Sequence, residues 1–329
     1  MAMRWPAEWE PHDAVWIGFP GNPAEWPEAL AEAQREVAAF ANAICDDGAG
    51  EKVMLVCRDR NDANIAKRLA DDQVQVICEP FGDIWLRDTG PVIIVGGDGG
   101  ERQAQRFGFN GWGGKFEMDG DQDIGLRLAK SLNIPTRHHD LVVEGGAIDG
   151  DGRGALVTTR QCVLNGNRNH NMTEPQFEDY MREALQIEKL CWLGDGLLAD
   201  HTDGHVDNLA RFVAPGKVVI PKAIDADDPN AAIFEDAAKR AVAAGLDVVQ
   251  IASVGRYEVD GAIAPASYMN FYIGNTVIAV PQYGAVNDER AISEIAALFP
   301  DHKIAALSSV ALLRGGGSFH CISQQIPSA

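Results

Sequence analysis

Five short polar motifs recur along this chain, and each stands at the front of a strand-like run. Each motif contains a residue that can bind a ligand or react with one: Asp88, Glu144, His205, Asn270 and Cys321. Neighbouring motifs are separated by about 50 to 65 residues. Such even spacing is typical of a repeated supersecondary unit, so we predict about five units that each bring a polar residue to one shared centre. The alternative is coincidental spacing in an ordinary α/β chain.

Helical and strand-like segments alternate throughout, which indicates an α/β or α+β class. The predicted helices cover about residues 26–43, 62–69, 122–132, 174–185, 229–244 and 288–299. The predicted strands cover about residues 53–57, 74–77, 92–95, 155–158, 218–220 and 276–280. A further strand at residues 9–16 is placed to complete the last unit and close a ring. No Pro/Ser-rich linker divides the chain, so we expect a single catalytic domain over residues 1–329 despite the length.

The charge balance bears on the kind of partner. A formal net charge of −20 disfavours nucleic acid and anionic membranes and favours the approach of a cation, although it also serves solubility alone. No stretch of about 20 apolar residues is present to span a membrane. The first residues lack the apolar centre of a secretion signal, so we expect a cytoplasmic protein whose six scattered cysteines are reduced. A homo-oligomer is compatible with this composition.

The candidate nucleophile is Cys321, which follows a glycine-rich turn. Alternate residues of an extended strand share a face, so His205 and Asp207 are expected to point the same way. By the same rule His320 points away from the Cys321 thiol. His205 is therefore the predicted acid/base partner of the thiol.

A thiol, a histidine and several acids together suit a guanidinium group. Acyl transfer creates an oxyanion, which carboxylates would oppose, whereas a guanidinium is positive and its attack by thiolate gives a neutral species. Carboxylates can clamp its N–H edges while imidazolium protonates the departing ammonia. No metal and no organic cofactor is needed for this chemistry. Carboxylates near Cys321 are also expected to raise the pKa of its thiol in the empty enzyme, which a bound cation would offset.

At these motifs the chain resembles the agmatine deiminase family, also called the bacterial-type peptidylarginine deiminases, of the guanidine-modifying superfamily. The matching segments cover nearly the whole chain: residues 9–16, 85–91 (WLRDTGP), 144–146 (EGG), 202–208 (TDGHVDN), 270–272 (NFY) and 315–325 (GGGSFHCISQQ). The resemblance implies a five-bladed α/β propeller with pseudo-fivefold ββαβ repeats. It also implies hydrolysis of agmatine to N-carbamoylputrescine and ammonia, on a route to putrescine, through an S-amidino-cysteine.

The resemblance also assigns roles to residues. Cys321 is the expected nucleophile and His205 the acid/base, with Glu144 contacting the guanidinium or orienting His205. Asp88 and Asp207 are expected to hold the guanidinium, and Trp85 to form a pocket wall. Asp203 is expected either to bind the substrate tail or only to cap a turn.

Three other functions remain open at this stage. The substrate could be peptidyl-arginine or another guanidino compound, or an amine could capture the intermediate, as in an amidinotransferase. The alternation of His201, Asp203, His205 and Asp207 is a fair metal-ligand spacing, so a metal-dependent hydrolase is a distant alternative. The segment at residues 110–114 (NGWGG) is expected to be a loop, either simply mobile or a lid.

Overall fold

The computed structural model describes residues 3–97 and 100–329, and it has a mixed α/β fold. Each predicted helix is present, with boundaries shifted by a few residues. The longer helices are α1 (Leu30–Cys45), α2 (Arg60–Leu69), α5 (Asp121–Ser131), α7 (Glu174–Leu185), α8 (Ala231–Ala243) and α9 (Asp288–Ala296). Shorter helical turns are η1 (Asp46–Gly48), α3 (Leu86–Thr89), α4 (Gly111–Gly114), η2 (Gly145–Ala147), α6 (Arg160–Val163), η3 (Val206–Asn208), η4 (Tyr268–Asn270) and α10 (Val310–Gly315).

Five sheets of three or four strands share one arrangement: a first strand runs antiparallel to a second, which runs parallel to a third beyond an intervening helix. Three of them have three strands: β8 (Ile148–Gly150), β9 (Ala155–Thr159), β10 (Lys189–Leu193); β11 (Arg211–Ala214), β12 (Lys217–Lys222), β13 (Asp247–Ala252); and β16 (Tyr272–Ile273), β17 (Val277–Gln282), β18 (Lys303–Ser308).

The other two sheets have four strands. They are β1 (Met3–Arg4), β5 (Val92–Gly96), β6 (Arg102–Gly108), β7 (Thr136–Val142), and β19 (Ser323–Pro327), β2 (His12–Gly18), β3 (Val53–Cys57), β4 (Gln75–Cys78). A separate hairpin joins β14 (Glu258–Val259) to β15 (Ala262–Ile263). In β19 and β2 the two ends of the chain pair antiparallel, with Gln325 opposite Val15, so the predicted pairing of the N-terminal strand with the last unit is confirmed.

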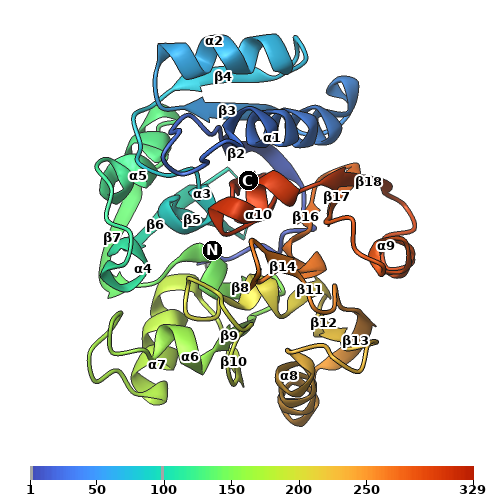
Figure 1. Ribbon diagram of the computed structural model, residues 1–329. Helices are drawn as coiled ribbons and strands as arrows, with labels where there is room; N and C mark the ends of the chain where they lie inside the picture. The colour runs from blue at the N-terminus through green and yellow to red at the C-terminus, as the bar shows by residue number, and fades with distance from the viewer. Residues whose placement is uncertain (1–2, 98–99) are drawn as a thin grey trace.

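The sheets lie around the middle of the molecule, with α2, α5, α7, α8 and α9 toward the outside, whereas α1 lies farther in, close to α10 (Figure 1). Periodicity explains this placement, because each helix buries one apolar stripe against its sheet. In α1 that stripe includes Val37, Phe40 and Ala41, which are among the least exposed side chains of the largest apolar cluster. In the described part of the chain, no helix combines the length and the apolar character needed to cross a bilayer.

Candidate active site

In each of the five sheets, one strand begins the shared antiparallel–parallel arrangement: β5, β8, β11, β16 or β19. A turn just before that strand supplies polar side chains to one place. Asp88 lies on α3 ahead of β5, Glu144 precedes η2 ahead of β8, and Asp207 lies on η3 ahead of β11. Asn270 ends η4 ahead of β16, and Cys321 lies in the turn ahead of β19. The spacing read from the sequence therefore corresponds to one contribution from each sheet.

The strand alternation proposed for His205 and Asp207 is wrong, because residues 206–208 form a 3₁₀ turn and not a strand. Both side chains are nevertheless fully buried at the site, and Val206 between them packs in the core. Positive φ angles at Asp203 (63°) and Gly204 (88°) turn the chain just before them.

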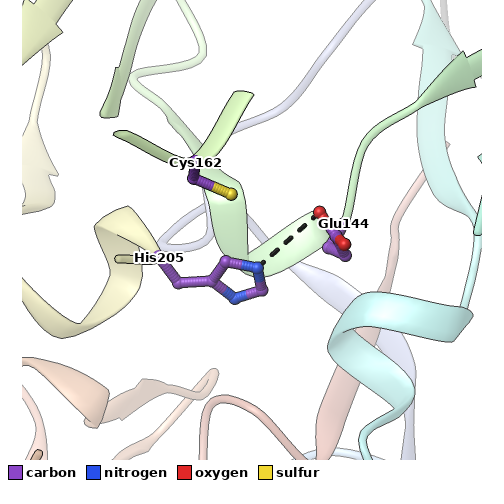
Figure 2. A group of neighbouring side chains, drawn as sticks. All are labelled: Glu144, Cys162 and His205. Carbon is purple, nitrogen blue, oxygen red and sulfur yellow. Dashed lines mark ion pairs between the residues drawn. The ribbon is translucent and has the colours of Figure 1, made fainter. Parts of the chain in front are cut away.

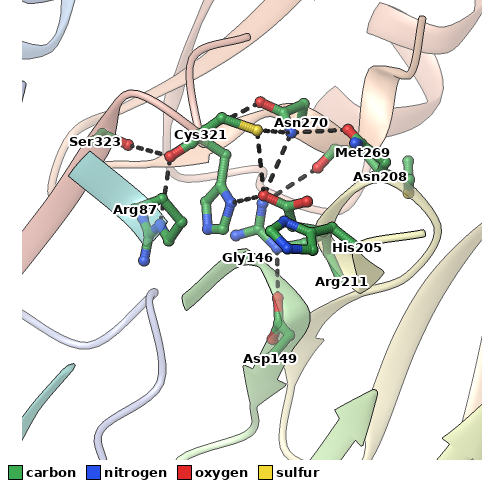
Figure 3. Close-up of polar contacts among 12 residues, drawn as sticks. Arg87, Gly146, Asp149, His205, Asn208, Arg211, Met269, Asn270, Cys321 and Ser323 are labelled. Carbon is green, nitrogen blue, oxygen red and sulfur yellow. Dashed lines mark hydrogen bonds and ion pairs between the residues drawn. The ribbon is translucent and has the colours of Figure 1, made fainter. Parts of the chain in front are cut away.

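The thiol of Cys321 lies between an amide and a carboxylate (Figure 3). Asn270 donates from Nδ2 to Sγ at 3.0 Å, and Sγ lies 3.5 Å from Oδ2 of Asp207. Burial raises the pKa of the Cys321 thiol well above its usual range, and the charges of Asp207 and Asp88 raise it further. The expectation of a raised thiol pKa in the empty site is thus confirmed.

The imidazole of His205 lies between two carboxylates. Nδ1 is 3.6 Å from Oδ1 of Asp88, and Nε2 is 3.8 Å from Oε2 of Glu144. Burial acts to lower the pKa of His205, but the charge of Asp88 and contacts with Cys162 and Glu144 outweigh it and hold the pKa well above its usual range. His205 is therefore an imidazolium at neutral pH.

The two predicted guanidinium-binding acids are held differently. Asp88 accepts the backbone N–H of Gly146 and the indole N–H of Trp112, each at 2.9 Å. Burial raises the pKa of Asp88 to about 6, with His205 opposing the rise and Asp207 adding to it. Asp207 accepts at Oδ2 from Nδ1 of His320 at 2.8 Å. Burial acts to raise the pKa of Asp207, but His320 outweighs it and the pKa is lowered.

Several polar atoms at this centre have no hydrogen-bond partner within the described residues, although they are buried. They are Oδ1 of Asp207 and both ring nitrogens of His205. Buried polar atoms are normally paired, so these atoms indicate a place for a ligand that donates and accepts hydrogen bonds. A Cβ on Gly146 would lie 2.6 Å from Nδ1 of His205 and 2.8 Å from Oδ1 of Asp88, so only glycine leaves this space open.

A cavity of about 230 Å³ leads to the thiol. Its lining residues are Ala24, Glu25, Asp83, Trp85, Asp88, Trp112, Phe116, His201, Thr202, Arg314, Gly315, Gly316 and Cys321. Trp85 is thus placed as a pocket wall, where it lies beside Gly317 and Trp26. The segment at 110–114 forms the short turn α4, and its Trp112 joins the site directly through Asp88.

Asp203 is placed less directly than the other predicted residues. Its carboxylate accepts from Lys115 at 2.6 Å, Arg168 at 2.7 Å and Asn167 at 2.9 Å, and it is not among the residues that line the cavity. These partners belong to distant segments of the chain, so the contacts do not test the turn cap, and both the cap and contact with a substrate tail stay predictions.

The proposed metal cluster of His201, Asp203, His205 and Asp207 is not assembled. In residues 3–97 and 100–329, the group whose metal-capable atoms lie mutually within 4.8 Å is Glu144, Cys162 and His205 (Figure 2). Glu144 in that group also accepts from Nε of Arg168 at 2.6 Å, and a fixed cation so close opposes a second one. The metal site predicted from alternating His and Asp is therefore wrong, because the turn at residues 203–208 separates these side chains.

Sequence reasoning missed a buried ionic network behind the site. Glu8 lies 2.9 Å from Nε2 of His320, 2.8 Å from Arg211 and 3.1 Å from Arg87. His320 links Asp207 to Glu8, and it binds the same Oδ2 of Asp207 that lies 3.5 Å from Sγ of Cys321. The strand rule used for His320 does not apply, because residues 320 and 321 lie in a turn and β19 begins at Ser323. The sequence did offer a sign of this network at Arg211, which lies between apolar neighbours in a strand-like run. An arginine buried among such residues almost always has a charged partner.

The model of the Porphyromonas-type peptidyl-arginine deiminase family matches residues 4–327. The chain belongs to this family. An agmatine deiminase of Pseudomonas aeruginosa (strain LESB58) is 34% identical over 99% of this chain and 95% of its own length. Among solved structures of the peptidyl-arginine deiminase fold, the agmatine deiminase of Enterococcus faecalis has a TM-score of 0.92 at 31% identity, covering 99% of this chain and 96% of that one. A cysteine-to-serine variant of C. jejuni agmatine deiminase with substrate bound has a TM-score of 0.91 at 26% identity, covering 99% and 96%.

Proposed function

We propose that this protein hydrolyses the guanidino group of agmatine to give N-carbamoylputrescine and ammonia. The observation that carries the proposal is the unpaired, buried Oδ1 of Asp207, which lies with the Asp88 carboxylate beside the Cys321 thiol and can accept hydrogen bonds from a ligand. A planar cation with N–H groups on two edges fits such a centre. Relatives at 31% and 34% identity that are named agmatine deiminases support agmatine as the guanidine.

In the proposed mechanism, Asp88 and Asp207 bind the N–H edges of the guanidinium and fix its carbon near Cys321. The positive charge lowers the pKa of the thiol, whose proton passes to solvent through the cavity, while Asn270 donates a hydrogen bond to the sulfur. The thiolate then attacks the guanidinium carbon to form a C–S bond. His205 gives its proton to one nitrogen, which leaves as ammonia, and an S-amidino-cysteine remains.

Water completes the reaction. His205, now neutral, removes a proton from the water that attacks the amidino carbon. The C–S bond then breaks to release the thiolate and the ureido product, and the remaining hydroxyl proton passes to the released ammonia. Glu144 orients His205 in this scheme, because its carboxylate is held by Arg168 and faces Nε2 of the ring. Trp85 packs against the alkyl chain.

We further propose that the five sheets are the blades of a five-bladed α/β propeller and that residues 1–329 form one catalytic domain. Their common strand arrangement supports this, as does the supply of site residues from the turn before each first strand. The cytoplasmic location, the place in putrescine formation and the oligomeric state stay predictions from the sequence.

Arginine or peptidyl-arginine is the second candidate substrate, and Arg314 is the observation that favours it. Arg314 lines the same cavity and could bind a carboxylate, although it pairs with Asp260 at 2.9 Å. The test is ammonia release measured side by side with agmatine, arginine and an arginyl peptide. We expect agmatine to have the highest kcat/KM, and equal or higher kcat/KM with arginine would overturn the substrate assignment.

A further inference from the structure

A second group of acids lies in the cavity that leads to Cys321. The charges acting on the thiol are those of Asp207 and Asp88, whereas those acting on Asp83 are chiefly those of Glu25 and Asp121. Asp83 and Glu25 both line the cavity wall that also includes Trp85. The cavity therefore has two separate acidic centres, and the mechanism uses only one of them.

Asp83 is buried without a cation. Asp83 is only 6% exposed, and its Oδ1 accepts a hydrogen bond from the N–H of Ile84 at 2.7 Å. Among residues 3–97 and 100–329, neither Asp83 nor Glu25 forms an ion pair with Lys, Arg or His, although the charge of Arg58 acts on Glu25. Two neighbouring carboxylates inside a cavity are unfavourable unless a cation or a proton joins them.

In the empty cavity a proton on Asp83 can join the two acids, since a hydrogen bond from Asp83 acts on Glu25. A cation that replaces this proton is better supplied by an organic ligand than by a metal ion. No third metal-capable side chain of the described residues completes a compact group with Asp83 and Glu25. A primary ammonium group, in contrast, has three N–H donors and is satisfied by two carboxylates.

We propose that Asp83 and Glu25 form the subsite that binds the terminal ammonium group of the substrate and that they set the preference for an amine-bearing guanidine. This inference rests on the proposed deimination reaction. Trp85, two residues after Asp83, then covers the alkyl chain between the reacting carbon and the amine. The nearby Arg314 disfavours the amine only weakly, because Asp260 already neutralises it.

The decisive experiment compares agmatine with n-butylguanidine, which has the same reacting group and chain but no amine. At about pH 9, where Asp83 is ionised, we expect Asp83→Asn and Glu25→Gln to lower kcat/KM for agmatine by about 10- to 100-fold, mainly through KM, because each removes a charge-assisted hydrogen bond. Neither variant should change kcat/KM for n-butylguanidine. Glu117→Gln removes an exposed carboxylate outside the cavity lining, and it should alter neither substrate.

The outcomes are separable. Equal losses on both substrates would assign Asp83 a structural role and overturn the subsite, as would unchanged agmatine kinetics in both variants. A wild-type protein that releases ammonia from neither substrate would instead overturn the proposed function. If Asp83→Asn fails to fold, Glu25→Gln, at a half-buried position nearer the surface, still tests the subsite.

The pH dependence gives a second test. Burial raises the pKa of Asp83 to about 8, and the charges of Glu25 and Asp121 add to the rise while the Ile84 N–H opposes it. Asp83 therefore holds a proton at neutral pH and gains its negative charge as pH rises through about 8. We expect the ratio of KM for agmatine to KM for n-butylguanidine to fall over this range in wild type. Titration of Cys321 and His205 cancels in that ratio, and the same fall in Asp83→Asn would contradict the assignment.

Discussion

The reactivity of Cys321 is set by three neighbouring side chains. Asn270 donates to the sulfur, whereas Asp207 and Asp88 oppose formation of the thiolate. The same carboxylates stabilise a bound guanidinium, so the site is least reactive when empty and becomes reactive with its substrate. This coupling protects a buried thiol from adventitious electrophiles.

We predict that Asp207→Asn makes Cys321 easier to alkylate while it abolishes deimination. Removing the carboxylate lowers the thiol pKa, so iodoacetamide should modify the empty variant faster than empty wild type at neutral pH. Guanidinium ions should also change the rate in wild type. The rate is measured by mass spectrometry of the Cys321 peptide in a Cys78→Ser background, because Cys78 is exposed. Rates insensitive to both changes would contradict the coupling.

The short turns before the first strands are the elements that carry function. They hold side chains at fixed angles because each turn is short and is followed at once by a paired strand. In η2 the backbone itself takes part, since Gly146 donates to Asp88 and leaves room for the His205 ring.

Gly146→Ala tests this role of η2. The new methyl group would lie 2.6 Å from Nδ1 of His205, so the ring must move, and we expect kcat to fall by about 100-fold or more. The matched control is Gly166→Ala, where a Cβ meets nothing within 4 Å. Both variants are assayed for ammonia release and for thermal unfolding. A fully active Gly146→Ala enzyme would show that the close approach is not needed.

For the whole molecule, Glu8 joins the N-terminal segment to three other sheets. Its carboxylate contacts Arg211 in β11, Arg87 on α3 and His320 before β19, and it accepts the N–H of Ile273 in β16 at 2.9 Å. Burial acts to raise the pKa of Glu8, but the charges of Arg211, His320 and Arg87 outweigh it and hold the pKa well below its usual range.

We expect Glu8→Gln to lower the free energy of unfolding by about 3 kcal/mol, because it leaves buried cations without a partner. A depressed carboxylate pKa stabilises the fold above the unfolded-state pKa, and this contribution is lost as pH falls through the folded-state pKa. The difference between wild type and variant should therefore shrink as pH drops below about 4.5. Urea unfolding followed by circular dichroism measures it. Glu10→Gln, in a pair with the partly exposed Arg4, is the control and should cost under about 1 kcal/mol. A loss in Glu8→Gln no larger than the control, or one independent of pH, would contradict this role.

The sequence by itself determined the elements and the residues that meet. Helix and strand periodicity is local, so the six longer helices and a central strand of each sheet were predictable, whereas the short helical turns and several edge strands were not. The even spacing of Asp88, Glu144, His205, Asn270 and Cys321 indicated one contribution per unit. Chemistry alone indicated Cys321 as the nucleophile and His205 as its acid/base partner, whereas the roles of Asp88, Glu144 and Asp207 came from the resemblance to the family.

Only the tertiary structure decided how the side chains are aimed and which charges are buried together. The turn at 206–208 replaced an expected strand, and the partners of Asp203, Cys162 and Glu8 come from segments far away in the chain. Burial and long-range pairing fix the pKa of Asp83, His205 and Cys321, and both depend on which segments pack against each other. A local pattern carries no record of that packing, because the same residue types in an exposed turn would have ordinary pKa values.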